Sequence, residues 1–192
     1  MCTKNKGKVI EFKEILDDFN LDIELVSLFD LNDEDDVEED GESFKENAFI
    51  KANYYFNKYH LPVISDDSGL CIDSLNGRPG INSARYSGLG PKGNIEKVLE
   101  ELNGKTNRDA FFICDLCFID LDGVVYHFEG RVDGKIDYSP TGEGGFGYDP
   151  IFLVNINGKY QSMACIGEEE KNKLSHRYHA IYNFAKWYKK NS

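Results

Sequence analysis

Apolar residues recur every three or four positions in four stretches of the chain, which is the spacing of an amphipathic helix. The first predicted helix covers about residues 7–20. The second begins at Ser43, which forms an S-x-x-E capping box with Glu46. Two further helices are predicted, one around residues 95–102 and one that begins near Ser175.

Shorter apolar runs between these helices predict strands. Residues 66–69 are expected to separate the predicted strand at residues 61–65 from the one at residues 70–75. We expect the strands at residues 22–29, 61–65, 70–75, 110–121, 124–132 and 150–154. Asp122 and Gly123 lie between two of these runs and are a strong hairpin signal. Strands that alternate with helices, together with one hairpin, predict an α/β fold with a mixed sheet. A length of 192 residues suits a single domain, residues 1–192, that is divided into lobes.

The charge of the chain is concentrated in one segment. Nine of the thirteen residues from Asp30 to Glu42 are acidic, and without them the formal net charge of −12 would be −3. A mildly acidic remainder excludes a broad nucleic-acid surface, which needs clustered basic residues. No apolar run reaches the roughly 18 residues of a membrane span, and the N-terminus lacks the apolar core of a secretion signal. With five cysteines, an odd number, we expect a cytoplasmic protein without a disulfide framework.

Cys114 and Cys117 form a C-x-x-C motif within an apolar run that predicts a buried strand. Side chains three positions apart on a strand point to opposite faces of the sheet. We therefore expect both thiols to be buried core residues and not a pair of metal ligands.

The start of the first predicted helix carries the pattern Thr3-x-Asn5-x-Gly7-Lys8. A helix N-terminus offers free N–H groups and the positive end of the helix dipole, so this pattern suits an anion. The spacing is not that of a Walker A loop. An ordinary capped helix with a surface lysine is the alternative interpretation.

Two carboxylates, Asp66 and Asp67, follow a predicted buried strand, where α/β proteins often place a ligand site. Neighbouring side chains of an extended segment point in opposite directions, so only one of the two must face such a site. A carboxylate there can hold Mg²⁺ or accept a proton from water, and an acid of the segment before Ser43 can complete the metal site. A strand-end turn and a solvated acidic surface are the alternatives.

Two segments near the C-terminus could bind the remainder of an anionic ligand. Phe146 lies among glycines at residues 144–147, where its ring could stack on a base, and Asp149 could accept a hydrogen bond from a ring N–H. The cations Lys171, His176 and Arg177 lie near the start of the last predicted helix, where they oppose the helix dipole. A sheet-edge turn and solvated cations are the alternatives for these two segments.

In order and spacing, these motifs resemble the inosine triphosphate pyrophosphatase family. The resemblance covers nearly the whole chain. It rests on T-K-N-K-G-K at residues 3–8 with Glu11, E-x-G-x-x-F-x-E-N-A at residues 39–48, S-D-D-S-G-L at residues 65–70, P-G-I-x-S-A-R-Y at residues 79–86, G-G-F-G-Y-D-P-I-F at residues 144–152 and S-H-R at residues 175–177.

The resemblance implies an enzyme that uses Mg²⁺ to hydrolyse ITP, dITP and XTP to the monophosphate and pyrophosphate, and so clears deaminated purines from the nucleotide pool. It also implies a homodimer whose protomer has an elongated mixed sheet and two lobes around a substrate cleft. By position, Glu39 and Asp67 are the implied metal ligands, and Asp67 is the implied proton acceptor. The implied substrate-binding residues are Thr3, Lys4, Asn5, Lys6, Gly7, Lys8, Ser68, Phe146, Gly147, Tyr148, Asp149, Lys171, His176 and Arg177.

The chain departs from the family pattern at its start. The family normally has a short apolar strand before the T-x-N-x-G-K motif, whereas only Met1 and Cys2 precede Thr3 here. We expect either that translation starts further upstream or that this strand is truncated, which would leave a sheet edge exposed. Two other function classes remain open from the sequence: a Maf-like pyrophosphatase acting on modified pyrimidines or methylated guanine, and a non-catalytic protein that binds nucleotides or buffers metal.

Overall fold

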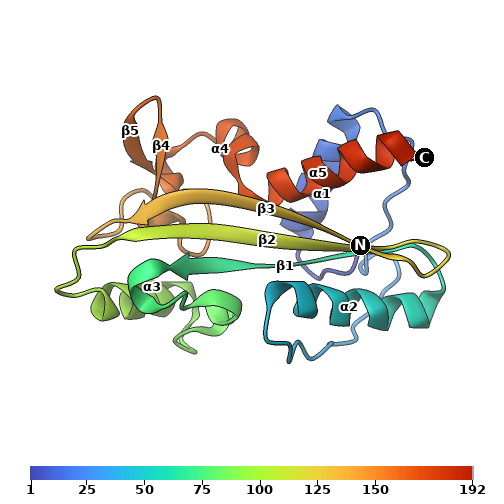
Figure 1. Cartoon of the computed structure of the whole chain (residues 1–192), viewed down its shortest axis with the longest axis horizontal. Coiled ribbons are helices and arrows are strands. Elements are labelled where there is room, and N and C mark those ends of the chain that lie inside the picture. Colours follow the sequence, from blue (N-terminus) through green and yellow to red (C-terminus); the bar gives the residue numbers. More distant parts are fainter. Residues whose placement is uncertain (192) are drawn as a thin grey trace. The chain divides into compact units, whose positions relative to one another are not determined.

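The computed structural model describes residues 1–191 and confirms an α/β fold (Figure 1). The α-helices are α1 (Lys6–Asp18), α2 (Phe44–Tyr59), α3 (Gly90–Glu101), α4 (Glu168–Leu174) and α5 (His176–Asn191). The strands are β1 (Val63–Ile72), β2 (Asp109–Ile119), β3 (Val125–Ile136), β4 (Phe152–Ile156) and β5 (Lys159–Ser162).

The strands form one five-stranded sheet in the order β1-β2-β3-β4-β5. A tight turn at Gly123 joins β2 to β3, and β4 pairs antiparallel with both β3 and β5, with Ile136 opposite Phe152 and Val154 opposite Gln161. The sheet is antiparallel, so the prediction of a mixed sheet is wrong. The reason is that residues 22–29, which were expected to form a strand after the first helix, form none, and the C-terminal strands follow one another as hairpins.

The chain divides into two compact units, and β1, β2 and β3 each contribute residues to both. The first unit contains residues 1–67, 114–130 and 177 onward, and the second contains residues 68–113 and 131–176. Each unit has its own core.

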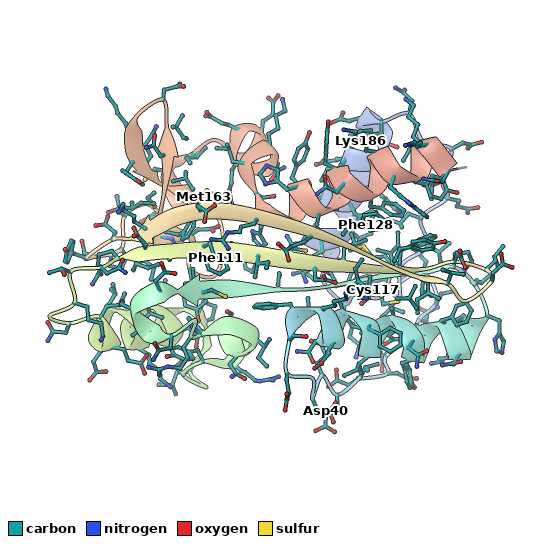
Figure 2. The ribbon with its side chains drawn as sticks, in the orientation of Figure 1. Asp40, Phe111, Cys117, Phe128, Met163 and Lys186 are labelled. Atoms are coloured by element: carbon teal, nitrogen blue, oxygen red, sulfur yellow. The ribbon has the colours of Figure 1, made fainter. Side chains whose placement is uncertain are left out.

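In the first unit, the sheet has a hydrophobic core on each face. Helices α1 and α5 pack on one face, against Cys114, Leu116 and Phe118, while α2 packs on the other, against Cys117 and Ile119. Figure 2 shows this division: Cys117 lies on the side of the sheet that faces α2, and Phe128 lies on the side of α5, where its ring contacts Phe184 at 5.5 Å.

The C-x-x-C motif is therefore split between these two cores. Cys114 and Cys117 are both fully buried and belong to opposite faces, which confirms the sequence prediction. Burial raises the pKa of both thiols, that of Cys117 to about 12.

The second unit packs α3 against the remaining half of the sheet. Its core gathers apolar residues of α3, of the strands and of the segment around Tyr148: Leu70, Ile72, Ile95, Val98, Leu102, Phe112, Ile136, Ile151 and Phe152. The core fixes the base of the glycine-rich segment at residues 144–147, because Tyr148 is buried and its hydroxyl donates to the carbonyl oxygen of Ser83 at 2.7 Å.

Several local predictions hold and others need correction. Ser43 caps α2 as expected, with its hydroxyl accepting from the N–H of Glu46 at 3.1 Å. Residues 66–69 do not interrupt the chain, because β1 runs through them as a single ten-residue strand. The last predicted helix begins next to Ser175 as expected, at the start of α5, and a short helix that was not predicted, α4, ends just before it. Among residues 1–191, no helix is long and apolar enough to cross a membrane.

Candidate active site

Strand β1 carries the two adjacent carboxylates Asp66 and Asp67 in the middle of its length. Asp66 is only 2% exposed, and its Oδ2 atom accepts from Lys8 Nζ at 2.8 Å and from Arg177 Nε at 3.5 Å. Arg177, at the start of α5, is 6% exposed and also donates to Glu11 Oε2 at 2.8 Å. Three elements of the first unit, α1, β1 and α5, therefore meet in one buried charge cluster.

The charges of this cluster hold one another ionised. Burial disfavours the charged form of Asp66, but the nearby cations Lys8 and Arg177 outweigh it and hold the pKa of Asp66 well below its usual range. Burial likewise disfavours the guanidinium of Arg177, but Asp66 and Glu11 together raise its pKa. The cluster therefore keeps the buried guanidinium of Arg177 charged at neutral pH.

The start of α1 positions Lys8 and leaves backbone donors free. Asn5 is the N-cap, and its Oδ1 accepts from the N–H of Lys8 at 3.3 Å. The N–H groups of Lys6 and Gly7 donate to no other residue in the described part of the chain. A Cβ at Gly7 would lie 3.2 Å from Asn5 Oδ1, so a side chain there would crowd the cap.

The other residues of the predicted anion loop lie around this helix start in the first unit. Asn5 donates from its N–H to the hydroxyl of Thr3 at 3.2 Å. The ammonium of Lys4 donates to the carbonyl oxygen of Glu34 at 2.8 Å, and that of Lys6 lies 5.5 Å from the ring centre of Phe29. The exposed lysines thus contact the acidic segment and its neighbours, whereas Lys8 alone reaches Asp66.

Asp67 has surroundings opposite to those of Asp66. Burial, followed by the negative charge of Glu39, raises its pKa to about 6, and a hydrogen bond from Asn47 opposes the rise. Asn47 itself lies on α2, where its Oδ1 accepts from the N–H of Gly41 at 2.8 Å and so ties the acidic segment to the helix. A carboxylate whose pKa lies near neutrality can accept a proton from water at physiological pH.

Glu39 lies close enough to influence Asp67 and forms an ion pair with Lys51 of α2. Burial disfavours the ammonium of Lys51, but the charges of Asp66 and Glu39 outweigh it and raise its pKa. Asp40, the next acid along the chain, is exposed and points away from the sheet in Figure 2. Within the acidic segment, therefore, Glu39 is directed towards the cluster and Asp40 is not.

The carboxylates of this cluster suit a hard divalent cation. No group of three or more His, Cys, Asp or Glu side chains within residues 1–191 is arranged to hold a metal by itself. The carboxylates of Glu39 and Asp67, of which Glu39 contributes to the raised pKa of Asp67, do fit Mg²⁺, which binds through one or two carboxylates and takes its remaining ligands from water and substrate phosphates. Cationic charge beside Glu39 and Asp67 would relieve their repulsion, as Lys51 does in part.

The second unit contains the predicted base-binding segment. Asp149 is buried, accepts from the N–H of Phe146 at 2.8 Å and forms an ion pair with Lys171 of α4 at 2.6 Å. A Cβ at Gly145 would lie 2.2 Å from Asp149 Oδ2 and 2.8 Å from Lys171 Nζ, so only glycine fits there. Phe146 itself is 65% exposed.

The structure places the remaining predicted residues of this unit as follows. Tyr148 is a core residue, as described above, and Gly147 has the positive φ of 62° that glycine tolerates best. Ser68 follows Asp67 on β1 and is half-buried. The ring of His176 stacks on Phe112, with 5.0 Å between ring centres and an interplanar angle of 12°.

Sequence reasoning missed three side chains of the first unit. Asp66 was considered only as the neighbour of Asp67, yet it joins Lys8 to Arg177. Asn47 and Lys51 were not considered as site residues, although both lie on α2 and contact the Asp67 and Glu39 carboxylates. Their four-residue spacing, which places two side chains on one helix face, was the signal that could have found them.

The fold and this cluster define a class: an α/β protein with buried cations beside a pair of mutually repelling carboxylates, which suits an anionic ligand together with a divalent cation. The chain matches the Ham1 family over residues 1–187, and it belongs to that family. This confirms the resemblance on which the sequence analysis relied.

Known proteins of similar sequence and structure agree with this assignment. A protein of Halalkalibacterium halodurans described as a dITP/XTP pyrophosphatase is 48% identical over 191 residues, which cover 97% of this chain and 96% of that protein. One of Bacillus subtilis with the same description is 45% identical, with 97% and 94% covered. The solved structure of the Staphylococcus aureus Ham1 protein superimposes with a TM-score of 0.90 at 37% identity and covers 100% of this chain and 97% of that one.

Proposed function

We propose that this protein hydrolyses non-canonical purine nucleoside triphosphates such as dITP, XTP and ITP to the monophosphate and pyrophosphate. The family and the described activity of its relatives support the reaction. The observation that carries the assignment of residues is the contrast between Asp66 and Asp67. One strand presents, on adjacent residues, a carboxylate that holds two cations and a carboxylate whose pKa of about 6 suits a base.

In this proposal Lys8 and Arg177 bind the phosphates. Both cations are already positioned by Asp66, so little ordering remains to be done when a polyanion binds. The N–H groups of Lys6 and Gly7 and the positive end of the α1 dipole add to the same charge. These donors are already in position to stabilise the negative charge that develops on the leaving pyrophosphate. Stabilisation of this kind is usually the largest single contribution to lowering the activation free energy.

Asp67 is the proposed general base. Its carboxylate would accept a proton from the water that attacks the α-phosphorus, while the bond from that phosphorus to the pyrophosphate oxygen breaks. Asn47 orients the carboxylate through its hydrogen bond, and without a metal ion, burial and then Glu39 raise its pKa to about 6. Asp66 is held ionised and paired, so it takes no part in proton transfer.

Mg²⁺ is the proposed cofactor, with Glu39 and Asp67 as the residues that would hold it. When bound, such an ion neutralises phosphate charge and polarises the scissile anhydride. Lys51 remains paired with Glu39 in the structure and limits the repulsion between the two carboxylates.

For the second unit we propose recognition of the purine base. The exposed ring of Phe146 offers a face for stacking, worth roughly 1–3 kcal/mol per base. The ion pair between Asp149 and Lys171 fixes the backbone on which Phe146 lies. A donor that pairs with the purine 6-oxygen would leave the 6-amine of adenine unpaired, and a mismatch of this kind can discriminate up to ~10⁴-fold.

Release of pyrophosphate from ITP, XTP, ATP and GTP, measured with and without Mg²⁺, tests the proposal. We expect release from ITP and XTP in the presence of Mg²⁺ and far less from ATP. Equal kcat/KM for ITP and ATP would contradict the proposed specificity, and binding without release would contradict catalysis. A homodimer in the cytoplasm, with residues 1–192 acting as one two-lobed catalytic domain, belongs to the same proposal, and light scattering after gel filtration tests the dimer.

A further inference from the structure

The second unit contains a motif that the proposed reaction does not use, the P-G-I-x-S-A-R-Y run at residues 79–86. Its central part, Gly80–Arg85, forms a 3₁₀ helix, in which Ser83 is the buried residue. The hydroxyl of Ser83 accepts from the N–H of Leu70 on β1 at 2.8 Å and donates to the carbonyl oxygen of Gly80 at 2.6 Å. Ser83 therefore fixes the motif to the sheet.

A buried asparagine in the first turn of α3 holds the shape of this motif. Asn94 is 4% exposed, and its Oδ1 atom accepts from the N–H and the hydroxyl of Ser87 at 2.7 and 2.8 Å. Its Nδ2 atom donates to the carbonyl oxygens of Ser83 and Ala84 at 3.2 Å each. An asparagine side chain has two donor hydrogens and two acceptor lone pairs, so these bonds use its full capacity. The two ends of residues 83–87 are thus tied to one side chain.

The carbonyl oxygen of Ser83 joins this network to the proposed base-binding segment. Besides the amide of Asn94, it accepts from the hydroxyl of Tyr148 at 2.7 Å, and all three residues are buried. A carbonyl oxygen has two lone pairs, so the two donors satisfy it completely. Burial raises the pKa of Tyr148, so its hydroxyl keeps the proton that it donates.

Phe146 depends on such anchors because its own surroundings hold it weakly. It is 65% exposed and lies between Gly145 and Gly147, whose φ angles are 73° and 62°. Glycines at positive φ leave the backbone much conformational freedom. One anchor of the segment is Asp149, which accepts from the N–H of Phe146 at 2.8 Å, and the other is the hydroxyl of Tyr148. The placement of the Phe146 ring therefore follows from how these two residues are held.

We propose that the hydroxyl of Tyr148, held by Ser83 and Asn94, positions the base-binding segment and thereby sets the selectivity of the enzyme between 6-oxopurines and 6-aminopurines. This inference rests on the proposed function, in which Phe146 stacks on the base. A base that can shift with its stacking ring no longer places its 6-substituent against a fixed partner, so the oxygen and the amine are distinguished less. Ser83 and Asn94 are positioning residues, and the Tyr148 hydroxyl likewise acts through the segment that follows Gly144.

Removal of one hydroxyl group tests the proposal. Tyr148→Phe keeps the ring in the core and removes the bond to Ser83, and Tyr138→Phe is the matched control, because Tyr138 lies in the same unit and is 73% exposed. We expect Tyr148→Phe to raise KM for ITP about 10-fold, which is the value of one hydrogen bond, and to change kcat by less than about twofold. The ratio of kcat/KM for ITP to that for ATP should fall about 10-fold.

Tyr138→Phe should leave the KM for ITP and the ratio of ITP to ATP unchanged. An active Tyr148→Phe variant with the wild-type ratio would overturn this proposal alone. A wild-type protein that releases no pyrophosphate from ITP would overturn the proposed function and this proposal with it.

Two product inhibitors separate positioning of the base from a general loss of structure. Inosine monophosphate carries the base, whereas inorganic pyrophosphate carries only phosphates, for which the proposed function assigns Lys8 and Arg177. In Tyr148→Phe the inhibition constant of inosine monophosphate should rise about 10-fold, and that of pyrophosphate should stay near the wild-type value. Equal rises for both inhibitors would indicate a general structural effect and would overturn the proposal.

A double-mutant cycle shows whether Tyr148 acts through the network. Asn94→Ala removes the amide that fixes the Ser83 carbonyl, so Tyr148→Phe should cause little further loss of selectivity when it is added to Asn94→Ala. If Asn94→Ala does not fold, Ser87→Ala takes its place, because it removes the hydroxyl that donates to Asn94. Losses of selectivity that simply multiply in the double variant would show that the two groups act independently and would overturn the proposal.

Discussion

The first unit contains two groups of carboxylates whose surroundings differ. In the Asp66 group, cations from α1 and α5 bind a buried acid on the central part of a strand. In the acidic segment, Asp33 and Asp35 share the ammonium of Lys58 at 2.6 Å each; the side chain of Asp33 is buried, but those of Lys58 and Asp35 are 36% and 44% exposed. The carboxylate of the Asp66 group thus positions two cations, whereas those of the acidic segment hold that segment against α2.

The difference is one of burial and of how many partners a charge must have. A buried carboxylate that loses its cationic partners strongly destabilises the folded protein, so the stability of the Asp66 group depends on all of its charges being present. Near the surface, water can replace a lost partner, and each pair contributes little. The two groups should therefore respond very differently to removal of one charge.

The largest effect is expected from Asp66→Asn. This change leaves the buried Arg177 and the partly buried Lys8 without their shared partner, so the free energy of unfolding should fall by about 3–5 kcal/mol. Urea unfolding measures the change. Asp36→Asn is the control, because Asp36 is fully exposed and lies 4.0 Å from Lys4, and it should unfold like the wild type. If Asp66→Asn and Asp36→Asn had similar free energies of unfolding, the two groups of carboxylates would not differ in their contribution to stability.

Asp67→Asn should have the next largest effect, on catalysis and not on stability. Loss of the proposed base should lower kcat for pyrophosphate release from ITP by roughly 10²-fold or more. The unfolding midpoint should stay near or above that of the wild type, because the carboxylate that repels Glu39 has gone. Activity near the wild-type level would show that Asp67 is not the base.

Glu39→Gln tests the one acid of the segment that is directed towards the cluster. If Glu39 helps to hold Mg²⁺, the Mg²⁺ concentration for half-maximal activity should rise by about 10-fold or more. Asp40→Asn, one residue further along and exposed, should leave that concentration unchanged. A rise that is equal in both variants would indicate a general effect of negative charge and no ligand role for Glu39.

The smallest effect is expected from Asp35→Asn, and it should depend on pH. Hydrogen bonds from Lys58 and then Tyr54 lower the pKa of the exposed Asp35 below its value in an unfolded chain, about 3.9. The stabilisation is therefore complete above the unfolded value and is lost as the pH falls below about 4. The unfolding midpoints of wild type and variant should differ at pH 7 and converge in acid, and a gap that widens in acid would contradict this assignment.

Much of the fold could be predicted because it depends on local patterns. The spacing of apolar residues located α1 and α2, and Asp122 and Gly123 located the hairpin of β2 and β3. The strand expected at residues 22–29 failed because a strand needs a partner: the alternation is present, but no neighbouring strand bonds to it. The alternation of apolar and polar residues in one segment does not show whether a neighbouring strand is available to pair with it.

The site was less accessible to sequence reasoning for a similar reason. Asp66 looked like a strand-end acid because two carboxylates are unusual within a buried strand. Its partners Lys8 and Arg177 lie 58 and 111 residues away in the sequence, so no local pattern could show that they neutralise it. The Ser43 and Glu46 pair, by contrast, was predictable because both partners lie within one helical turn.

The unbroken course of β1 has a consequence for how the sequence can vary. A single inserted or deleted residue between Val63 and Ser65 would reverse the faces of all the residues that follow, so the positions of Asp66 and Asp67 would be taken by neighbours of the wrong chemistry. The exposed loop of residues 103–107, between α3 and β2, carries no such constraint on side-chain direction. Natural and engineered length changes should therefore accumulate in that loop and be absent from the first half of β1.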